Sequence, residues 1–200
     1  MTEWLAFFGA FNPPTLAHLD LAEFAMKRTG AGGVLFVPSK AGYIRDVQGK
    51  DYAYGDEERM GMLLKAGEKR PWMAVTDIEL RSPVQPRTYE TLCRLREGGR
   101  TAALLIGSDK LPELDGKWMY VEQIAREFGI VVLTRGADEC ARMIASSAFL
   151  SGLSRYIRVL ETPRETRNVS STQVRERIAR IRELRREIGQ MVPEEILPLL

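Results

Sequence analysis

Residues 4–19 of the chain read WLAFFGAFNPPTLAHL. This stretch shows the pattern that the rest of the chain repeats. Five apolar residues at Trp4–Phe8 stop at Gly9 and a Pro-Pro turn, after which helical periodicity begins. A short apolar run that passes through a tight turn into a helix is typical of the first strand–helix unit of an α/β sheet. The only histidine of the chain, His18, falls in the first turn of this helix.

The same alternation continues through the rest of the chain. Each further apolar run is short, ends at Gly, Pro or polar residues, and is followed by a segment with helical periodicity. The predicted strands span residues 4–8, 34–37, 73–75, 102–106, 130–133 and 156–160, and the predicted helices span 17–28, 56–65, 89–97, 119–127 and 138–149. Six strands that alternate with helices predict an α/β, Rossmann-like three-layer fold, in which helices cover both faces of a mostly parallel sheet.

A last helix is predicted after the Ser-Ser-Thr run at residues 170–172, whose hydroxyls suit the free N–H groups at a helix start. Apolar residues then recur at steps of three and four, which places them on one helical face. These residues are Val174, Ile178, Ile181, Leu184 and Ile188. A second short helix is predicted over residues 193–199. Residues 171–200 are predicted to form the helical C-terminal part of one domain that spans residues 1–200.

Composition places the chain among ordinary globular proteins, with 44% apolar and 28% charged residues. No apolar run approaches the roughly 20 residues that cross a bilayer, so an integral membrane protein is excluded. Two cysteines, Cys93 and Cys140, and one histidine are too few for a zinc site or a disulfide scaffold. The sequence therefore predicts a cytoplasmic protein that has no membrane partner and no metal site built from its own side chains.

The positive charge is concentrated in the C-terminal quarter. The whole chain carries a formal net charge of +2, whereas residues 155–187 hold ten Arg and five Glu, a net charge of +5. Such a segment favours polyanions such as phosphates, although a solvated helix face explains most of its arginines equally well. Tyr156 is the single aromatic residue there, so a nucleic-acid surface, which interleaves basic and aromatic residues, is not expected.

Two segments carry features of a phosphate site. The chain has neither a G-x-G-x-x-G turn after its first strand nor a P-loop. His18 instead stands at a helix N-terminus, where free N–H groups and the helix dipole favour an anion. In the second segment, residues 168–175 read NVSSTQVR, so three hydroxyls and an arginine share a helix start. Taken separately, the first segment is compatible with a turn that carries a partly exposed histidine, and the second with an ordinary N-cap.

Taken together, the two segments resemble the motifs of the nicotinate/nicotinamide-mononucleotide adenylyltransferases, which are nucleotidylyltransferases of the α/β phosphodiesterase superfamily. Residues 9–18 resemble the family pattern G-x-F-[DN]-P-x-[HT]-x-x-H, and residues 169–175 resemble [IV]-S-S-T-x-[IV]-R. Three weaker resemblances follow the order of the family. They cover residues 88–92, residues 106–111 with Trp118, and residues 192–196.

The sequence departs from the family pattern in ways that concern the acceptor. Asn12 and Thr15 are similar to the nicotinamide branch of the family, whereas bacterial nicotinate enzymes have Asp and His at these positions. Phe8 stands where many members have a second glycine, and the basic P-P-H-K segment of bacterial members is missing. The choice between nicotinate and nicotinamide mononucleotide therefore stays open, as does any closure of loop 38–55 over substrate.

The resemblance implies a reaction. The 5′-phosphate of a pyridine mononucleotide attacks the α-phosphorus of ATP, which releases pyrophosphate and forms the dinucleotide in NAD biosynthesis. ATP and the mononucleotide are the expected partners. Mg²⁺ is the expected cofactor, bridging the phosphates through ATP and water. In-line transfer of this kind depends on positioning and charge neutralisation rather than on a protein nucleophile.

The resemblance also implies site residues. Catalytic roles fall to His18, as a donor to the α-phosphate, and to Thr15 and Arg175 along the phosphate chain. The expected ATP-binding residues offer donors to the phosphates or contacts to the nucleoside. They are Gly9, Phe11, His18, Gly107, Asp109, Ser170, Ser171, Thr172 and Arg175. The expected acceptor-binding residues are Asn12, Lys50, Thr88 and Trp118, with Trp118 stacking on the pyridine ring unless it is a core aromatic.

Other functions remain open on the sequence. One is nucleotidyl transfer to another acceptor, such as phosphopantetheine, or from a cytidylyl donor. Another is a catalytically silent nucleotide-binding regulator, with which Thr15 and Phe8 are compatible. The joint presence of His18, the hydroxyls at residues 170–172 and Arg175 favours the enzyme. The sequence leaves the oligomeric state open, and a homo-oligomer is compatible with it.

Overall fold

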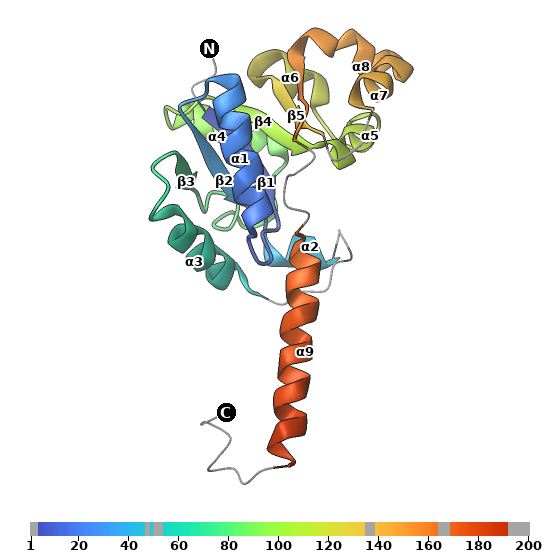
Figure 1. Cartoon of the computed structure of the whole chain (residues 1–200). Helices are drawn as coiled ribbons and strands as arrows, with labels where there is room; N and C mark the ends of the chain where they lie inside the picture. The colour runs from blue at the N-terminus through green and yellow to red at the C-terminus, as the bar shows by residue number, and fades with distance from the viewer. Residues whose placement is uncertain (1–3, 47–48, 50–53, 135–138, 164–168, 192–200) are drawn as a thin grey trace.

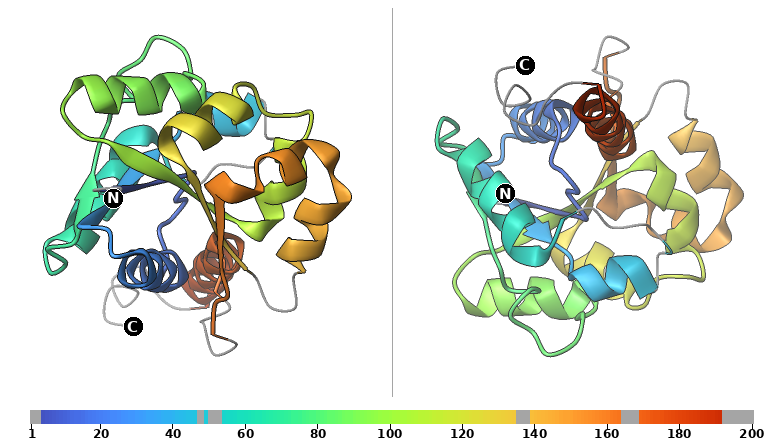
Figure 2. Two further views of the ribbon diagram at one scale, coloured as in Figure 1. Left: turned by 90° about the horizontal axis from the view of Figure 1, so that it is seen from above. Right: turned by 90° about the horizontal axis from the view of Figure 1, so that it is seen from below.

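The computed structural model describes residues 4–46, 49, 54–134, 139–163 and 169–191. Its centre is a six-stranded parallel sheet with helices on both faces (Figures 1 and 2). The strands are β1 (Trp4–Gly9), β2 (Gly33–Pro38), β3 (Met73–Val75), β4 (Ala102–Gly107), β5 (Ile130–Leu133) and β6 (Ile157–Leu160). They are arranged in the order β3-β2-β1-β4-β5-β6. The predicted α/β fold and its six strands are confirmed.

Helices connect these strands. They are α1 (Leu16–Thr29), α2 (Ala41–Asp46), α3 (Asp56–Gly67), α4 (Thr88–Glu97), α5 (Leu111–Leu114), α6 (Val121–Phe128), α7 (Cys140–Ser146), α8 (Ala148–Gly152) and α9 (Ser171–Gly189). Short 3₁₀ turns cover Ser108–Lys110 and Ser154–Tyr156. The helices predicted at 17–28, 56–65 and 89–97 agree with α1, α3 and α4 to within two residues at each end.

The sheet separates two apolar cores, because side chains alternate between its faces along each strand. All six residues of β2 are buried, as expected for a central strand of a parallel sheet. Ala6 and Leu35 belong to the core beneath α4 to α8, whereas Leu5 and Phe36 belong to the core beneath α1 and α3. Figure 2 shows α4 (green) and α6 (yellow) on one side of the sheet and α1 (blue) on the other.

One predicted helix is two helices in the structure. The segment 138–149 was expected to be continuous, but Ser147 has an extended backbone (φ −102°, ψ 118°) that separates α7 from α8. The Ser147 hydroxyl accepts a hydrogen bond from the Leu150 N–H, which caps α8. Serine competes with helical hydrogen bonding in this way, and the apolar periodicity on either side concealed the break.

Two further differences concern boundaries. The helix predicted from Met119 begins at Val121, because Tyr120 has a left-handed backbone with φ 64° that cannot continue a helix. Loop 38–55 contains the six-residue helix α2, which is too short to produce a clear periodicity. The short helix predicted over residues 193–199 lies outside the described residues.

The last helix extends away from the rest of the molecule (Figure 1). The predicted amphipathic helix is confirmed as α9, but none of its described residues is buried. Its apolar stripe is open, with Ile181 53% and Leu184 39% exposed. Among the described residues, no helix combines the length and apolar character needed to span a membrane.

Candidate functional site

The strand order changes direction at β1. From this strand the chain first builds β2 and β3 on one side, and later β4, β5 and β6 on the other side. Connections that leave the carboxyl ends of two such neighbouring strands diverge to opposite faces, and they open a crevice where α/β proteins bind ligands. Gly9 and Gly107 end β1 and β4. The predicted residues that follow them, residues 10–18 and Asp109, therefore lie at this crevice.

The turn between β1 and α1 has an uncommon backbone. Phe11 is left-handed with φ 45°, and the peptide bond between Asn12 and Pro13 is cis. The Phe11 side chain is buried, and its ring meets that of His18 nearly at right angles, with 5.3 Å between centroids. A Cβ atom on Gly9 would come within 3.0 Å of the Phe11 ring. Glycine therefore allows Phe11 to close over the end of β1 and to support His18.

His18 is held through its Nδ1 atom. The Thr15 N–H donates to Nδ1 at 3.0 Å, and Thr15 Oγ1 lies 2.8 Å from the same atom. A backbone N–H can only donate, so Nδ1 is the acceptor and the proton of the neutral ring lies on Nε2. His18 thus caps α1 with one nitrogen, and its other nitrogen is a hydrogen-bond donor. Thr15, predicted to contact phosphate, is buried with its hydroxyl directed to this ring.

The start of α9 lies against the turn after β1, although more than 150 residues separate them in sequence. Ser171 Oγ donates to the Pro13 carbonyl at 2.7 Å, and Arg175 Nη1 donates to the Asn12 carbonyl at 2.7 Å. A second guanidinium nitrogen of Arg175 lies 3.3 Å from Thr172 Oγ1. The N-terminus of α9 thereby contacts the turn that leads into α1. The dipoles and free N–H groups at the starts of both helices favour an anion.

Ser170 and the residues after β4 complete this set. The Ser170 hydroxyl accepts from the Gln173 N–H at 3.2 Å, so it serves as the N-cap of α9. At the end of β4, a Cβ atom on Gly107 would lie only 2.5 Å from Asp109 Oδ1. Glycine at this position therefore leaves room for the exposed Asp109 carboxylate at the crevice. Ser108, between them, is buried.

The predicted acceptor residues come from several elements. Asn12 is 3% exposed, and its Oδ1 atom is buried without a hydrogen-bond partner among the described residues. Thr88 is half-buried as the first residue of α4. Trp118 is half-buried, donates from Nε1 to Glu113 Oε2 at 3.4 Å, and lines a hollow of about 300 Å³ beside α6. Lys50 lies outside the described residues. The structure thus brings the first and last motifs into contact, while Thr88 and Trp118 stand on other elements.

Known proteins share both the sequence and the fold. Residues 6–177 match the profile of the family described as cytidylyltransferase-like. The chain belongs to the cytidylyltransferase-like family. One curated relative, a probable nicotinate-nucleotide adenylyltransferase of Trichlorobacter lovleyi, is 31% identical over 94% of this chain and 91% of its own length. One of Caldicellulosiruptor bescii is 27% identical over 95% of this chain and 93% of its own length.

A solved structure agrees with the fold of the cytidylyltransferase-like chain. Nicotinic acid mononucleotide adenylyltransferase of Plasmodium falciparum, in complex with NaAD, aligns with a TM-score of 0.65 at 16% identity, covering 88% of this chain and 83% of that chain. The family resemblance expected from the two motifs is confirmed. This member of the family is therefore a nucleotidyltransferase.

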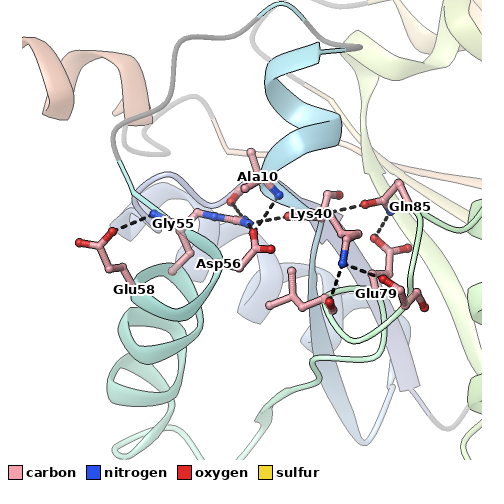
Figure 3. Close-up of polar contacts among 12 residues, drawn as sticks. Ala10, Lys40, Gly55, Asp56, Glu58, Glu79 and Gln85 are labelled. Carbon is pink, nitrogen blue, oxygen red and sulfur yellow. Dashed lines mark hydrogen bonds and ion pairs between the residues drawn. The ribbon is translucent and has the colours of Figure 1, made fainter.

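The sequence patterns did not predict a role for one buried arginine near this site. Arg59 of α3 is fully buried. Its Nη1 donates to the Ala10 carbonyl at 2.5 Å, and its Nη2 donates to the Ser39 carbonyl at 2.6 Å and to Asp56 Oδ1 at 2.5 Å. Figure 3 shows Ala10 and Asp56 at this junction. Arg59 stands four residues before the buried Leu63, so both lie on the same face of α3. This spacing is the feature of the sequence that could have indicated its burial.

A second buried cluster supports the segment that leads to Thr88. Glu79 is 1% exposed, and its carboxylate accepts from Gln85 Nε2 at 2.5 Å and Thr91 Oγ1 at 2.9 Å (Figure 3). Burial raises the pKa of Glu79 to about 7, although these hydrogen bonds favour the charged form. The Lys40 ammonium donates to the carbonyls of Leu80 and Ser82 at 2.6 and 2.7 Å, which orients this lysine toward the 76–87 segment.

The described part of the family site has no protein metal cage. Among the described residues, no three side chains of His, Cys, Asp or Glu lie close enough together to hold a metal ion. At the crevice, the exposed Asp109 carboxylate is a hydrogen-bond acceptor, and the N–H and O–H groups at the starts of α1 and α9 are donors. This donor set suits an anion, or a metal ion that arrives already bound to one.

Proposed function

We propose that the chain transfers AMP from ATP to nicotinate mononucleotide, forming the dinucleotide and pyrophosphate. An oxygen of the acceptor 5′-phosphate forms the new bond to the α-phosphorus of ATP, and the bond to the bridging oxygen of pyrophosphate breaks. The observation that carries this proposal is the contact of Arg175 with the Asn12 carbonyl at 2.7 Å. This contact brings a cation and the N-terminus of α9 to the turn that leads into α1, and we infer that the phosphate charge develops there, beside His18.

His18 supplies the donor for the reacting phosphate in this proposal. With Nδ1 occupied by the Thr15 N–H, the Nε2–H is the group that can donate to an α-phosphate oxygen. Charge on that oxygen increases in the transition state, so a fixed donor lowers the barrier more than it strengthens ATP binding. Thr15 acts by fixing the ring, and the backbone at Gly9 and Phe11 lies close to the phosphates.

The N-terminus of α9 holds the leaving pyrophosphate. Arg175 has five N–H donors, and its contacts with the Asn12 carbonyl and with Thr172 leave capacity for phosphate oxygens. The hydroxyls of Ser170, Ser171 and Thr172 and the N–H groups of the first turn add neutral donors. Mg²⁺ brought by ATP would supply charge neutralisation at the phosphates, and the exposed Asp109 carboxylate and the N–H and O–H donors at this end of the sheet are compatible with it.

Nucleoside and acceptor contacts fall to residues from the other elements. Asp109, which is exposed beside Gly107, suits ribose hydroxyls because a carboxylate only accepts hydrogen bonds. The buried Oδ1 of Asn12 is a further acceptor that a bound nucleotide can satisfy. Trp118 would stack on the pyridine ring, Thr88 would contact its carboxylate, and Lys50 would meet the acceptor phosphate. Nicotinate is proposed because curated relatives are named for that substrate.

The comparisons do not favour the alternatives of another acceptor or a silent regulator. Relatives that align over 93% and 91% of their own length are named as probable nicotinate-nucleotide adenylyltransferases. His18, Arg175 and the hydroxyls of residues 170–172 are all present. A regulator that only binds nucleotide would not need a histidine with a fixed tautomer.

An assay with paired acceptors tests the proposal. The chain is incubated with ATP, Mg²⁺ and either nicotinate or nicotinamide mononucleotide, and dinucleotide and pyrophosphate are both measured. We expect equimolar products and a preference for nicotinate mononucleotide. A preference for the amide would correct the acceptor alone. Binding of ATP without product from either acceptor would contradict the proposed reaction, and phosphopantetheine would then be the next acceptor to try.

A further inference from the structure

Arg59 occupies a position where a charge is costly. Its side chain is fully buried, the largest such side chain among the described residues. A buried charge costs several kcal/mol unless its surroundings satisfy it. Arg59 donates hydrogen bonds to the carbonyls of Ala10 and Ser39 and to the carboxylate of Asp56. These three residues belong to the segments that follow β1 and β2 and to the start of α3.

The two carbonyls lie where the sheet ladder ends. β1 and β2 are paired up to Gly9 and Pro38, and the Ser39 N–H still donates to the Gly9 carbonyl at 3.0 Å. Beyond this point the strands separate, so the next carbonyls need donors from elsewhere. The two NH₂ groups of one planar guanidinium supply both. They therefore fix the separation between the end of β2 and the turn that begins at Ala10.

The Ala10 contact continues to His18 through Phe11. Ala10 directly precedes Phe11, whose left-handed backbone is unfavourable for a bulky residue and persists only where its neighbours hold it. The Phe11 ring in turn meets the ring of His18, with 5.3 Å between centroids. Movement of the Ala10 carbonyl would therefore change the orientation of the histidine without any direct contact between Arg59 and substrate.

Asp56 completes the arrangement. Its Oδ1 accepts from Arg59 Nη2 at 2.5 Å and from the Ala41 N–H at 2.8 Å (Figure 3). It thereby balances the buried charge and connects the guanidinium to the first residue of α2. A lysine at position 59 would keep the charge, but its single ammonium lacks the rigid fork that reaches both carbonyls in one plane.

We propose that Arg59 is a positioning residue for adenylyl transfer, which holds the β1–α1 turn so that the His18 donor stays aligned with the reacting phosphate. The inference rests on the proposed function. A misalignment of about 1 Å can lower a rate by about 100-fold, although substrate still binds. The loss should therefore affect kcat and not the KM for ATP.

Arg59→Lys is the first test, with Arg142→Lys as the matched control at an exposed arginine of α7. We expect Arg59→Lys to lower kcat by about 10- to 100-fold while the KM for ATP changes by less than about threefold. The control should match the wild type. Should Arg59→Lys fail to fold, Asp56→Asn replaces it. That variant keeps an oxygen that accepts from Arg59 and Ala41 but removes the negative charge of the ion pair. We expect a smaller loss of kcat, again with little change in the KM for ATP.

A double-variant cycle with His18→Gln separates positioning from general damage. If Arg59 acts through His18, Arg59→Lys should slow the His18→Gln protein by at most a few-fold, because the aligned donor is already missing. Losses that multiply, or a kcat for Arg59→Lys equal to that of the control, would overturn the inference alone. A wild-type chain that forms no dinucleotide would overturn the proposed function and this inference with it.

Discussion

His18 takes the third position of α1, where a capping box usually has glutamate or glutamine. The position itself could be predicted, since the sequence shows a histidine shortly after a Pro-Pro turn. Its tautomer could not, because this depends on the Thr15 N–H reaching Nδ1 in the folded turn. The orientation of Thr15 could not be predicted either. The family pattern suggests that Thr15 contacts phosphate, whereas in the fold its hydroxyl is directed to the histidine ring.

Two substitutions of His18 separate its role as a cap from its role as a donor. His18→Gln keeps an oxygen that can accept the Thr15 N–H, whereas His18→Ala removes the cap as well. We expect both variants to lower kcat by roughly 100-fold or more, because both lack the Nε2 donor. Only His18→Ala should lower the free energy of unfolding, by about 1 kcal/mol.

Steady-state kinetics and urea unfolding measure these two quantities. Near-normal turnover in His18→Gln would show that the imidazole is a structural cap and that another group serves the α-phosphate. ATP affinity should change less than kcat in both variants, as for a donor that acts in the transition state.

Elements with strong apolar patterns could be predicted from the sequence, and elements defined by single polar contacts could not. The six strands are short, mostly apolar runs, and β2, β4 and β5 are buried over all or nearly all of their length, so their positions are plain in the sequence. The division between α7 and α8 depends on one hydroxyl, that of Ser147, within an otherwise helical pattern. For α9 the periodicity predicts a helix correctly, but it cannot state whether a neighbouring element covers the apolar face, and here the face is exposed.

The proposed role of the N-terminus of α9 predicts a preference for triphosphate. Arg175→Ala should weaken ATP binding by about 10- to 100-fold, because charge-assisted hydrogen bonds to the phosphates are lost. AMP, which lacks the outer phosphates, should bind as before. Titrations of both nucleotides measure the effect, and Arg177→Ala, an exposed arginine on the same helix, is the control. Equal weakening for ATP and AMP would mean that Arg175 only ties α9 to the Asn12 carbonyl.

In the whole molecule, the strand order brings the site residues together, because β1 and β4 are neighbours and the segments that follow them leave the same edge of the sheet. The two decisive motifs are far apart in sequence, and the resemblance to a family implies that they meet, but the contacts themselves appear only in the fold. Buried polar residues were hardest to predict. Composition does not show which charged groups find partners inside. Arg59 shares a helical face with the buried Leu63, which is a weak signal, whereas Glu79 lies in a turn, where no periodicity indicates burial.

Glu79 makes global stability depend on pH. Burial raises the pKa of its carboxyl group to about 7 in the folded protein, from an ordinary value of 4.5. The folded state therefore retains the proton while the unfolded state loses it. The contribution of Glu79 to the free energy of unfolding should be largest below pH 4.5. It should fall by about 3 kcal/mol as the pH rises to 7. Glu79→Gln lacks this contribution, so its stability relative to the wild type should rise over that interval.

Urea unfolding at a series of pH values measures this difference. Glu122→Gln, at an exposed glutamate of α6, is the control, and its difference from the wild type should stay nearly constant. A constant difference for Glu79→Gln as well would contradict the raised pKa and would mean that the buried carboxylate stays charged.

The order of residues along the chain has a consequence for protein synthesis. Ser171 and Arg175 come after all six strands, yet they contact the turn at Asn12 and Pro13. Ribosomes add residues from the N-terminus, and early segments can fold while later ones are still being made. A growing chain can therefore assemble β1 to β6 before Ser171 and Arg175, which we propose to hold the triphosphate, exist. On that proposal, consumption of ATP would begin only after translation has passed Arg175, and interrupted products would have the sheet but remain inert.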